Sequence, residues 1–140
     1  MSTNRKRKLP LIMIADADEE ERALMRAILK LVGFDVVEAL DGHQVVKVAK
    51  QRLPDLLVID MALSSLDGIA GVDRIREKSA LPDLPIVAVS TEETQPRFHR
   101  SKPSTVFLHK PIEYRQFYTF IDRFLPGRMT ALARSKYLAL

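Results

Sequence analysis

The sequence of 140 residues has no cysteine and no tryptophan, and only 6% of its residues are aromatic. Without cysteine, disulfide bridges and thiolate metal sites are excluded. No apolar run approaches the ~20 residues that a membrane-spanning helix needs, and the N-terminus lacks the cleavage site of a secretory signal peptide. Hydrophobic residues make up 46% of the chain, which is ample for a core. We therefore expect a cytoplasmic protein with one folded domain.

Acidic residues are absent from both ends of the chain, and this explains the basic pI of about 9.5. Residues 1–8 carry four basic side chains and residues 126–140 carry three. Removing these seven from the 22 basic residues leaves 15 against 18 acids in residues 9–125, a net charge of −3. A nucleic-acid-binding domain is expected to carry its basic surface on the folded body. Binding to nucleic acid or a membrane surface is thus an alternative for the basic arm alone.

These boundaries predict a disordered basic arm at 1–8, one domain at 9–125 and a C-terminal tail at 126–140. The tail is weakly amphipathic, through Met129, Leu132, Ala133, Tyr137 and Leu140. This pattern fits either a frayed tail or a short helix for a partner or a dimer, and we favour the tail.

Apolar runs of strand length alternate with helical patterns through the body. Strands are predicted at 9–15, 34–39, 56–59, 86–89 and 105–108. The first helix follows Asp18, with Leu24, Ala27, Ile28 and Leu31 as its apolar stripe. The third helix, after Asp67-Gly68, is predicted to turn Ile69, Val72 and Ile75 inward and Asp73, Arg74, Arg76 and Glu77 outward. The last helix, from about Glu113, carries Phe117, Phe120, Ile121 and Phe124 on one face.

Five alternations of strand and helix predict an α/β fold with one doubly wound parallel sheet. We expect a flavodoxin-like order of 2-1-3-4-5, with helices on both faces. Residues 91–104 should hold the fourth helix, but Pro96 and Pro103 make it short, broken or absent.

Polar residues stand where four of the predicted strands end. Asp16 follows the first, Asp60 the third, Ser90 the fourth and Lys110 the fifth. The carboxyl ends of parallel strands share one edge of the sheet, where ligands bind. Carboxylates favour a hard cation such as Mg²⁺, and a hydroxyl with a lysine suits an anionic group. The edge therefore predicts metal-assisted handling of a phosphoryl group.

Several short motifs occur in order through the body. They are Ala15-Asp16, Gly33-Phe34, Asp41-Gly42, Pro54-Asp55 leading to Asp60, Asp67-Gly68, Pro85-Ile86 leading to Ser90, and Lys110-Pro111. With these motifs, residues 11–125 resemble a response-regulator receiver domain of two-component signalling.

The resemblance implies a role for each of these residues. Asp60 matches the aspartate that accepts a phosphoryl group from a histidine kinase or phosphotransfer protein, with a strand-end cap as the alternative. Ser90 and Lys110 match the residues that contact that group, and Lys110-Pro111 matches a bond that is typically cis. Phe107 matches the switch aromatic, although it is equally well explained as core. Mg²⁺ would be held by Asp16, Asp60 and the backbone carbonyl of Ala62.

The sequence also departs from the family pattern. Receiver domains usually have two adjacent acids after the first strand, and this chain has Asp16-Ala17. The missing acid is a direct Mg²⁺ ligand, so we expect weak Mg²⁺ binding. Asp18 is better explained as the N-cap of the first helix, with Glu21 three residues on, than as a replacement ligand.

Three functions follow from these observations. The first is a phosphoacceptor receiver domain whose output passes through contact with another protein. The contact face would consist of residues 91–104, the fifth strand and the last helix. A homodimer is one form of such contact. The second is a receiver-like interaction module that works without phosphorylation, because of Ala17. The third is the nucleic-acid or membrane-surface binder described above. We do not expect an enzyme acting on an external substrate, because the sequence has no Gly-rich phosphate loop and no cofactor fingerprint.

Overall fold

Five parallel strands form a single sheet in the order β2-β1-β3-β4-β5, which confirms the predicted flavodoxin-like fold. The computed structural model describes residues 9–66, 68–91, 93 and 102–138. The strands are β1 (Leu11–Ala15), β2 (Asp35–Ala39), β3 (Leu56–Asp60), β4 (Ile86–Ser90) and β5 (Thr105–His109). The basic arm and most of the segment for which we predicted a short or broken fourth helix lie outside the described residues.

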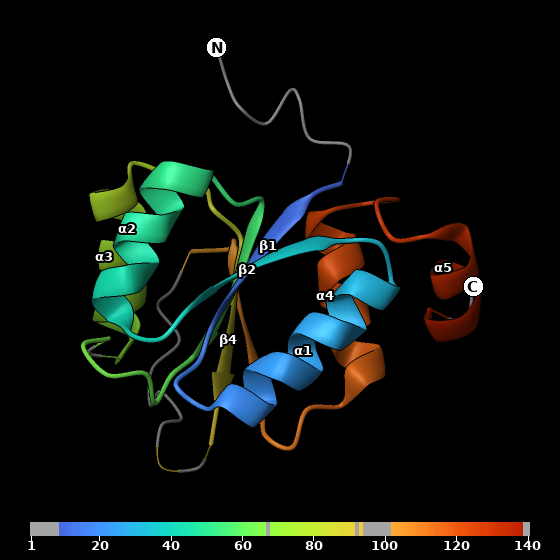
Figure 1. Cartoon of the computed structure of the whole chain (residues 1–140), viewed down its shortest axis with the longest axis horizontal. Coiled ribbons are helices and arrows are strands. Elements are labelled where there is room, and N and C mark those ends of the chain that lie inside the picture. Colours follow the sequence, from blue (N-terminus) through green and yellow to red (C-terminus); the bar gives the residue numbers. More distant parts are fainter. Residues whose placement is uncertain (1–8, 67, 92, 94–101, 139–140) are drawn as a thin grey trace.

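Helices cover both faces of the sheet (Figure 1). One face carries α1 (Glu19–Leu31), α4 (Tyr114–Phe124) and α5 (Ala131–Tyr137), and the other carries α2 (Gly42–Arg52) and α3 (Gly68–Ser79). β1 and β4 are buried along their whole length, as is β3 up to Ile59, because both faces of the sheet are covered. None of the described helices is long and apolar enough to cross a membrane.

The stripe of α1 that faces the sheet is not the predicted one. Leu24 and Leu31 are 55% and 74% exposed. The residues buried instead are Met25, Leu29 and the C-cap Val32. These positions also follow the i, i+4, i+7 spacing of a helix face, so the sequence contains two neighbouring apolar stripes that both fit a helix.

Two ion pairs join α1 to β2 when α1 has this orientation about its axis. Arg22 Nε lies 3.2 Å from Glu38 Oε1, and Arg26 Nη1 lies 2.7 Å from Glu38 Oε2. The arginine side of the helix thus lies beside the β2 strand, while Met25 and Leu29 are buried against the sheet. Apolar spacing within α1 could not reveal this choice, because it depends on a partner in another strand.

Arg76 was predicted to point outward, and this prediction is wrong, since the residue is only 1% exposed. Its Nε donates to the carbonyl oxygen of Leu84 at 3.0 Å, and its Nη2 donates to Thr105 Oγ1 at 2.6 Å. Its Nη1 pairs with Asp73 at 3.3 Å. Burial lowers the pKa of Arg76, and the charge of Asp73 opposes that effect. The guanidinium thus joins α3, the loop before β4 and the first residue of β5.

The segment after α4 is not frayed, contrary to the interpretation that we favoured. Met129 and Ala133 are buried against the core shared by α1 and α4. The N–H of Thr130 donates to the carbonyl of Val32 at 2.9 Å, and the rings of Tyr118 and Tyr137 lie 4.8 Å apart. α5 therefore belongs to the packed domain, as Figure 1 also shows.

Replacing Arg76 with methionine tests the buried guanidinium. Arg76→Met keeps the apolar stem but leaves two buried acceptors without their donor, so we expect a loss of about 2 kcal/mol or more in the free energy of unfolding. Urea denaturation measures this change. Lys78→Met, on the exposed side of the same helix, is the control and should stay within about 0.5 kcal/mol. Equal effects of the two substitutions would contradict the assigned role.

A pair of alanine variants tests the docking of α5. Met129 is 3% exposed and Leu132 is 79% exposed, although Leu132 lies only three positions further along the chain. We expect Met129→Ala to lower the free energy of unfolding by about 2 kcal/mol or more, and Leu132→Ala to leave it within about 0.5 kcal/mol. Thermal and urea unfolding supply the measurement. A Met129→Ala variant as stable as Leu132→Ala would show that α5 is not packed in solution.

Candidate functional site

Asp60 lies at the end of β3, and its carboxylate is held from two sides. Oδ1 accepts the backbone N–H of Ala62 at 2.9 Å, and Oδ2 lies 3.0 Å from Nζ of Lys110. The side chain is 12% exposed, so it remains within reach of solvent. The N–H of Ala62 curls the loop after β3 back over the carboxylate. This arrangement leaves the Asp60 carboxylate oriented and accessible at the edge of the sheet.

Residues 61–66 of that loop are fixed against the start of α2. The N–H of Gly42 donates to the carbonyl of Ser64 at 2.9 Å. A Cβ at Gly42 would lie 2.7 Å from the carbonyl oxygen of Ser65, which is closer than real Cβ atoms approach. Glycine thus allows α2 to touch the loop that shapes the surroundings of Asp60.

The predicted residues at the other strand ends come to the same edge of the sheet. Asp16 follows β1, which pairs directly with β3, and its carboxylate is near that of Asp60. Ser90 is 3% exposed at the end of β4, and its carbonyl accepts the N–H of Lys110 at 2.7 Å. The structure therefore brings Asp16, Asp60 and Lys110 together and places Ser90 beside them, where it ties the end of β4 to Lys110.

Phe107 lies apart from this cluster. Its ring is partly buried against the core on the α2 and α3 face of the sheet. The peptide bond between Lys110 and Pro111 is cis, as the resemblance implied.

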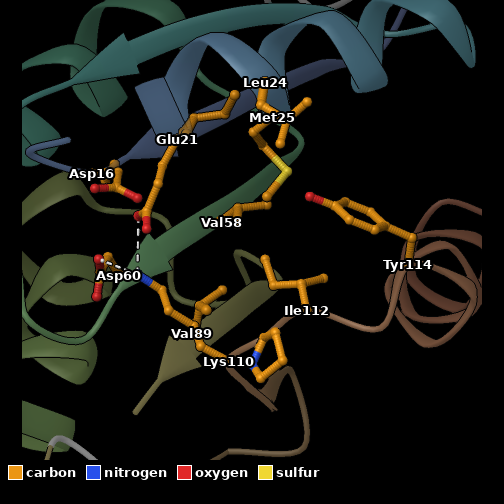
Figure 2. A pocket seen from close by; sticks show the side chains of 13 residues that line it. Asp16, Glu21, Leu24, Met25, Val58, Asp60, Val89, Lys110, Ile112 and Tyr114 are labelled. Carbon is orange, nitrogen blue, oxygen red and sulfur yellow. Dashed lines mark hydrogen bonds and ion pairs between the residues drawn. The ribbon is translucent and has the colours of Figure 1, made fainter. Parts of the chain in front are cut away.

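Glu21 is a site residue that the sequence reasoning missed. Its Oε2 lies 2.9 Å from Nζ of Lys110, so this ammonium bridges Glu21 and Asp60 (Figure 2). The sequence suggested a capping box in which Glu21 would help to cap its own helix. The only signal for a second role was the position of Glu21 in the first turn of the helix, five residues after the strand-end Asp16.

The backbone explains why the Glu21 side chain is free to reach the site. Asp18 is the N-cap as predicted, because its Oδ1 accepts the N–H of Glu21 at 2.9 Å. In a capping box the glutamate would accept the N–H of the N-cap residue. Here the N–H of Asp18 donates to Asp16 Oδ1 at 2.8 Å. The Glu21 carboxylate is therefore not needed as a cap.

The pKa values of Asp16 and Glu21 are shifted in opposite directions. Burial is the largest cause that raises the pKa of Asp16 to about 7, followed by a hydrogen bond with Glu21, while the charges of Asp60 and Glu21 add to the effect. The same hydrogen bond from Asp16, together with that from Lys110, lowers the pKa of Glu21. Burial lowers the pKa of Lys110, but its bonds to Glu21 and Asp60 outweigh this and raise it. Near neutral pH, Asp16 is thus the carboxyl that exchanges its proton.

A cavity of about 500 Å³ opens from this cluster between α1, α4 and the sheet. Its charged end is formed by Asp16, Glu21, Asp60 and Lys110, and Figure 2 shows the apolar side chains that continue from it. These are Leu24, Met25, Val58, Val89 and Ile112, with Tyr114 at the far side. Apolar walls lower the local dielectric constant and strengthen the interactions of the charges beside them.

The same carboxylates are the residues that could hold a metal ion. One oxygen each from Asp16, Glu21 and Asp60 lies within 4.8 Å of the others. Ala17, next to Asp16, has no oxygen in its side chain. The donor set is therefore three carboxylates, which suits a hard divalent cation.

A doubly wound sheet with acids and a lysine at its carboxyl edge defines a class of α/β proteins that bind ligands at that edge. The sequence pattern of the response regulator receiver domain matches residues 12–122. This chain belongs to that family.

Individual relatives agree with the family assignment. The chain is 28% identical over 105 residues to the alkaline phosphatase synthesis transcriptional regulatory protein PhoP of Bacillus subtilis (strain 168), covering 75% of this chain and 44% of the relative. It is 32% identical over 82 residues to the DNA-binding dual master transcriptional regulator RpaA of Synechocystis sp. (strain ATCC 27184 / PCC 6803 / Kazusa), covering 59% and 34%. The chain thus spans less than half of the length of these curated relatives.

Solved structures share the fold. The signal receiver domain of an HD domain-containing protein from Pseudomonas fluorescens Pf-5 has a TM-score of 0.72 at 17% identity, covering 86% of this chain and 98% of that one. The receiver domain of a sensor histidine kinase from Pseudomonas aeruginosa PAO1 has a TM-score of 0.71 at 22% identity, covering 84% and 98%. That second domain was crystallised with a magnesium ion coordinated in its active site cleft.

The raised pKa of Asp16 predicts a pH-dependent stability. The folded state holds this proton up to about pH 7, whereas the unfolded chain releases it near 3.8. The contribution of Asp16 therefore stabilises the fold at low pH, and it is lost progressively as the pH rises from about 3.8 to about 7. The lowered pKa of Glu21 affects stability only below its ordinary value of 4.5, so it does not cancel the trend above pH 5.

Asp16→Asn should remove that pH dependence. Asparagine retains the acceptor for the N–H of Asp18 and offers a permanent donor to Glu21. We expect its free energy of unfolding, relative to the natural sequence, to be higher at pH 8 than at pH 5, measured with urea in the presence of EDTA. Glu20→Gln, on the exposed side of the same helical turn, should change stability equally at both pH values. If the difference in the free energy of unfolding between Asp16→Asn and the natural sequence were the same at both pH values, the raised pKa of Asp16 would be contradicted.

Proposed function

We propose that Asp60 accepts a phosphoryl group from a histidine kinase or phosphotransfer protein, and that the output of this receiver domain passes through protein contact. The observation that carries the proposal is the arrangement of the Asp60 carboxylate. It is 12% exposed, and Ala62 and Lys110 orient it at the charged end of a cavity. A carboxylate in this position is a nucleophile for an incoming phosphoryl group.

The neighbours of Asp60 suit the product as well as the reactant. An aspartyl phosphate carries more negative charge than the carboxylate, and the ammonium of Lys110 is already in contact with that oxygen. Ser90 ends the adjacent strand, one residue beyond Val89, which is the register partner of Asp60. We assign to Ser90 the contact with a phosphoryl oxygen and to Phe107 the switch that follows it.

The donor set also supports magnesium at this site. Asp16, Asp60 and the backbone carbonyl of Ala62 would hold the ion, which would neutralise part of the charge on the phosphoryl group. Acidic oxygens at this spacing fit a hard cation, and one structural neighbour carries magnesium in its cleft. Ala17 removes one family ligand, so binding by Asp16, Asp60 and the Ala62 carbonyl alone would be weak.

A specific observation favours a second candidate. Ala17 lacks the acid that receiver domains place beside Asp16, and Lys110 already neutralises Asp60 in the absence of a phosphoryl group. A receiver-like interaction module that works without phosphorylation would have this composition. In either case the contact face includes β5 and α4, while the remainder of that face, within residues 91–104, lies mostly outside the described residues.

Phosphorylation of Asp60 is tested directly by mass spectrometry. Incubation with Mg²⁺ and acetyl phosphate, or with a cognate kinase, should add one phosphoryl group to the intact chain. Asp60→Asn should abolish this mass shift, whereas Asp55→Asn, one strand length earlier, should retain it. No shift with any donor would reject phosphorylation. Partner binding that is unchanged in Asp60→Asn would then support the phosphorylation-independent module.

A further inference from the structure

Glu21 fills a gap that the sequence leaves at this site. The position beside Asp16 is Ala17, yet three carboxylates still meet at the edge of the sheet. The third one comes from the first turn of α1 rather than from the loop after β1. Side chains of a helix lean toward its N-terminus, so a glutamate in this turn extends over the end of the sheet, and Figure 2 shows it directed at Asp60 and Lys110.

The distances suit a shared cation. Oxygen ligands lie about 2.1 Å from Mg²⁺, so two opposite ligands of an octahedral ion are about 4.2 Å apart. The oxygens of Asp16, Glu21 and Asp60 already lie within 4.8 Å of one another. The Glu21 side chain is 47% exposed and can therefore adjust its position without disturbing the core.

A cation is already held between two of these residues. The ammonium of Lys110 lies 2.9 Å from Glu21 and 3.0 Å from Asp60. This contact is independent of Asp16, and it shows that Glu21 and Asp60 converge on a common positive charge. Asp18, the acid next to Ala17 on its other side, is used as the helix N-cap.

We infer that Glu21 supplies the carboxylate that Ala17 lacks, so that a divalent cation is bound by Asp16, Glu21 and Asp60. The inference rests on the proposed function only for the identity of the ion, because the convergence of the three side chains is independent of phosphorylation. It makes the metal site of this chain different from the family pattern in one ligand, which moves from the β1 loop to α1.

A titration with Mn²⁺ tests whether Glu21 is a ligand. The electron paramagnetic resonance signal measures the free Mn²⁺, and Mg²⁺ is then added as a competitor. Glu21→Gln should weaken Mn²⁺ affinity by at least about tenfold, the loss that removal of even an outer-shell partner causes. Glu20→Gln removes the same charge from an exposed position on the same turn and should change affinity less than about twofold, because exposed charges are screened.

Two further variants separate a metal ligand from a residue that only positions Lys110. In a Lys110→Met background, Glu21→Gln should still weaken Mn²⁺ binding, because the lost ligand does not act through the ammonium. In the Glu21→Gln background, Ala17→Asp should restore affinity by returning an acid to the position that the family uses. Circular dichroism confirms that each variant is folded before titration.

Three results would overturn the inference: equal effects of Glu21→Gln and Glu20→Gln, loss of the Glu21 effect in the Lys110→Met background, or no rescue by Ala17→Asp. Phosphorylation is measured separately by the mass shift. A Glu21-dependent Mn²⁺ site in a chain that no donor phosphorylates would support the ligand assignment and reject the proposed function. Phosphorylation of a chain whose Mn²⁺ affinity does not depend on Glu21 would support the proposed function and reject the ligand assignment.

Discussion

The electrostatic contact between Lys110 and two carboxylates organises the functional edge of this protein. Three acids meet there, and their mutual repulsion is relieved by the ammonium, which bridges Glu21 and Asp60, and by the proton that Asp16 retains. The same ammonium connects α1, β3 and the loop after β5. Local charge balance and the arrangement of three distant segments therefore depend on one side chain, and any ligand of Asp60 must be compatible with it.

Most of the fold and part of the site could be predicted from the sequence. Strands buried on both faces are continuous apolar runs, and in a parallel sheet the residues that follow them must share one edge. This reasoning located Asp16, Asp60 and Lys110 without any knowledge of side-chain contacts. It works because the positions depend on the backbone alone, which the alternation of strands and helices determines.

The missed features all depend on contacts between distant segments. Glu21 was assigned to helix capping, and only the bond from Asp18 to Asp16 shows that its side chain is free. Arg76 was placed outside because it is charged, but its acceptors come from a loop and from β5. The exposed stripe of α1 and the docking of α5 have the same origin, because apolar spacing shows that a helix has a buried face and does not show what covers it.

The buried guanidinium of Arg76 has a mechanical consequence for β5. This edge strand pairs only with β4 within the described sheet, and its first residue, Thr105, is additionally held by Arg76. Its other end leads into Lys110, whose anchors are polar and partly exposed to solvent. One end of the strand is thus fixed in the core and the other is held by exchangeable bonds. Exchange of the contacts of Lys110 would therefore leave the Thr105 end of β5 in place, because its bond to Arg76 is buried and β5 is paired with β4 from Thr105 to His109.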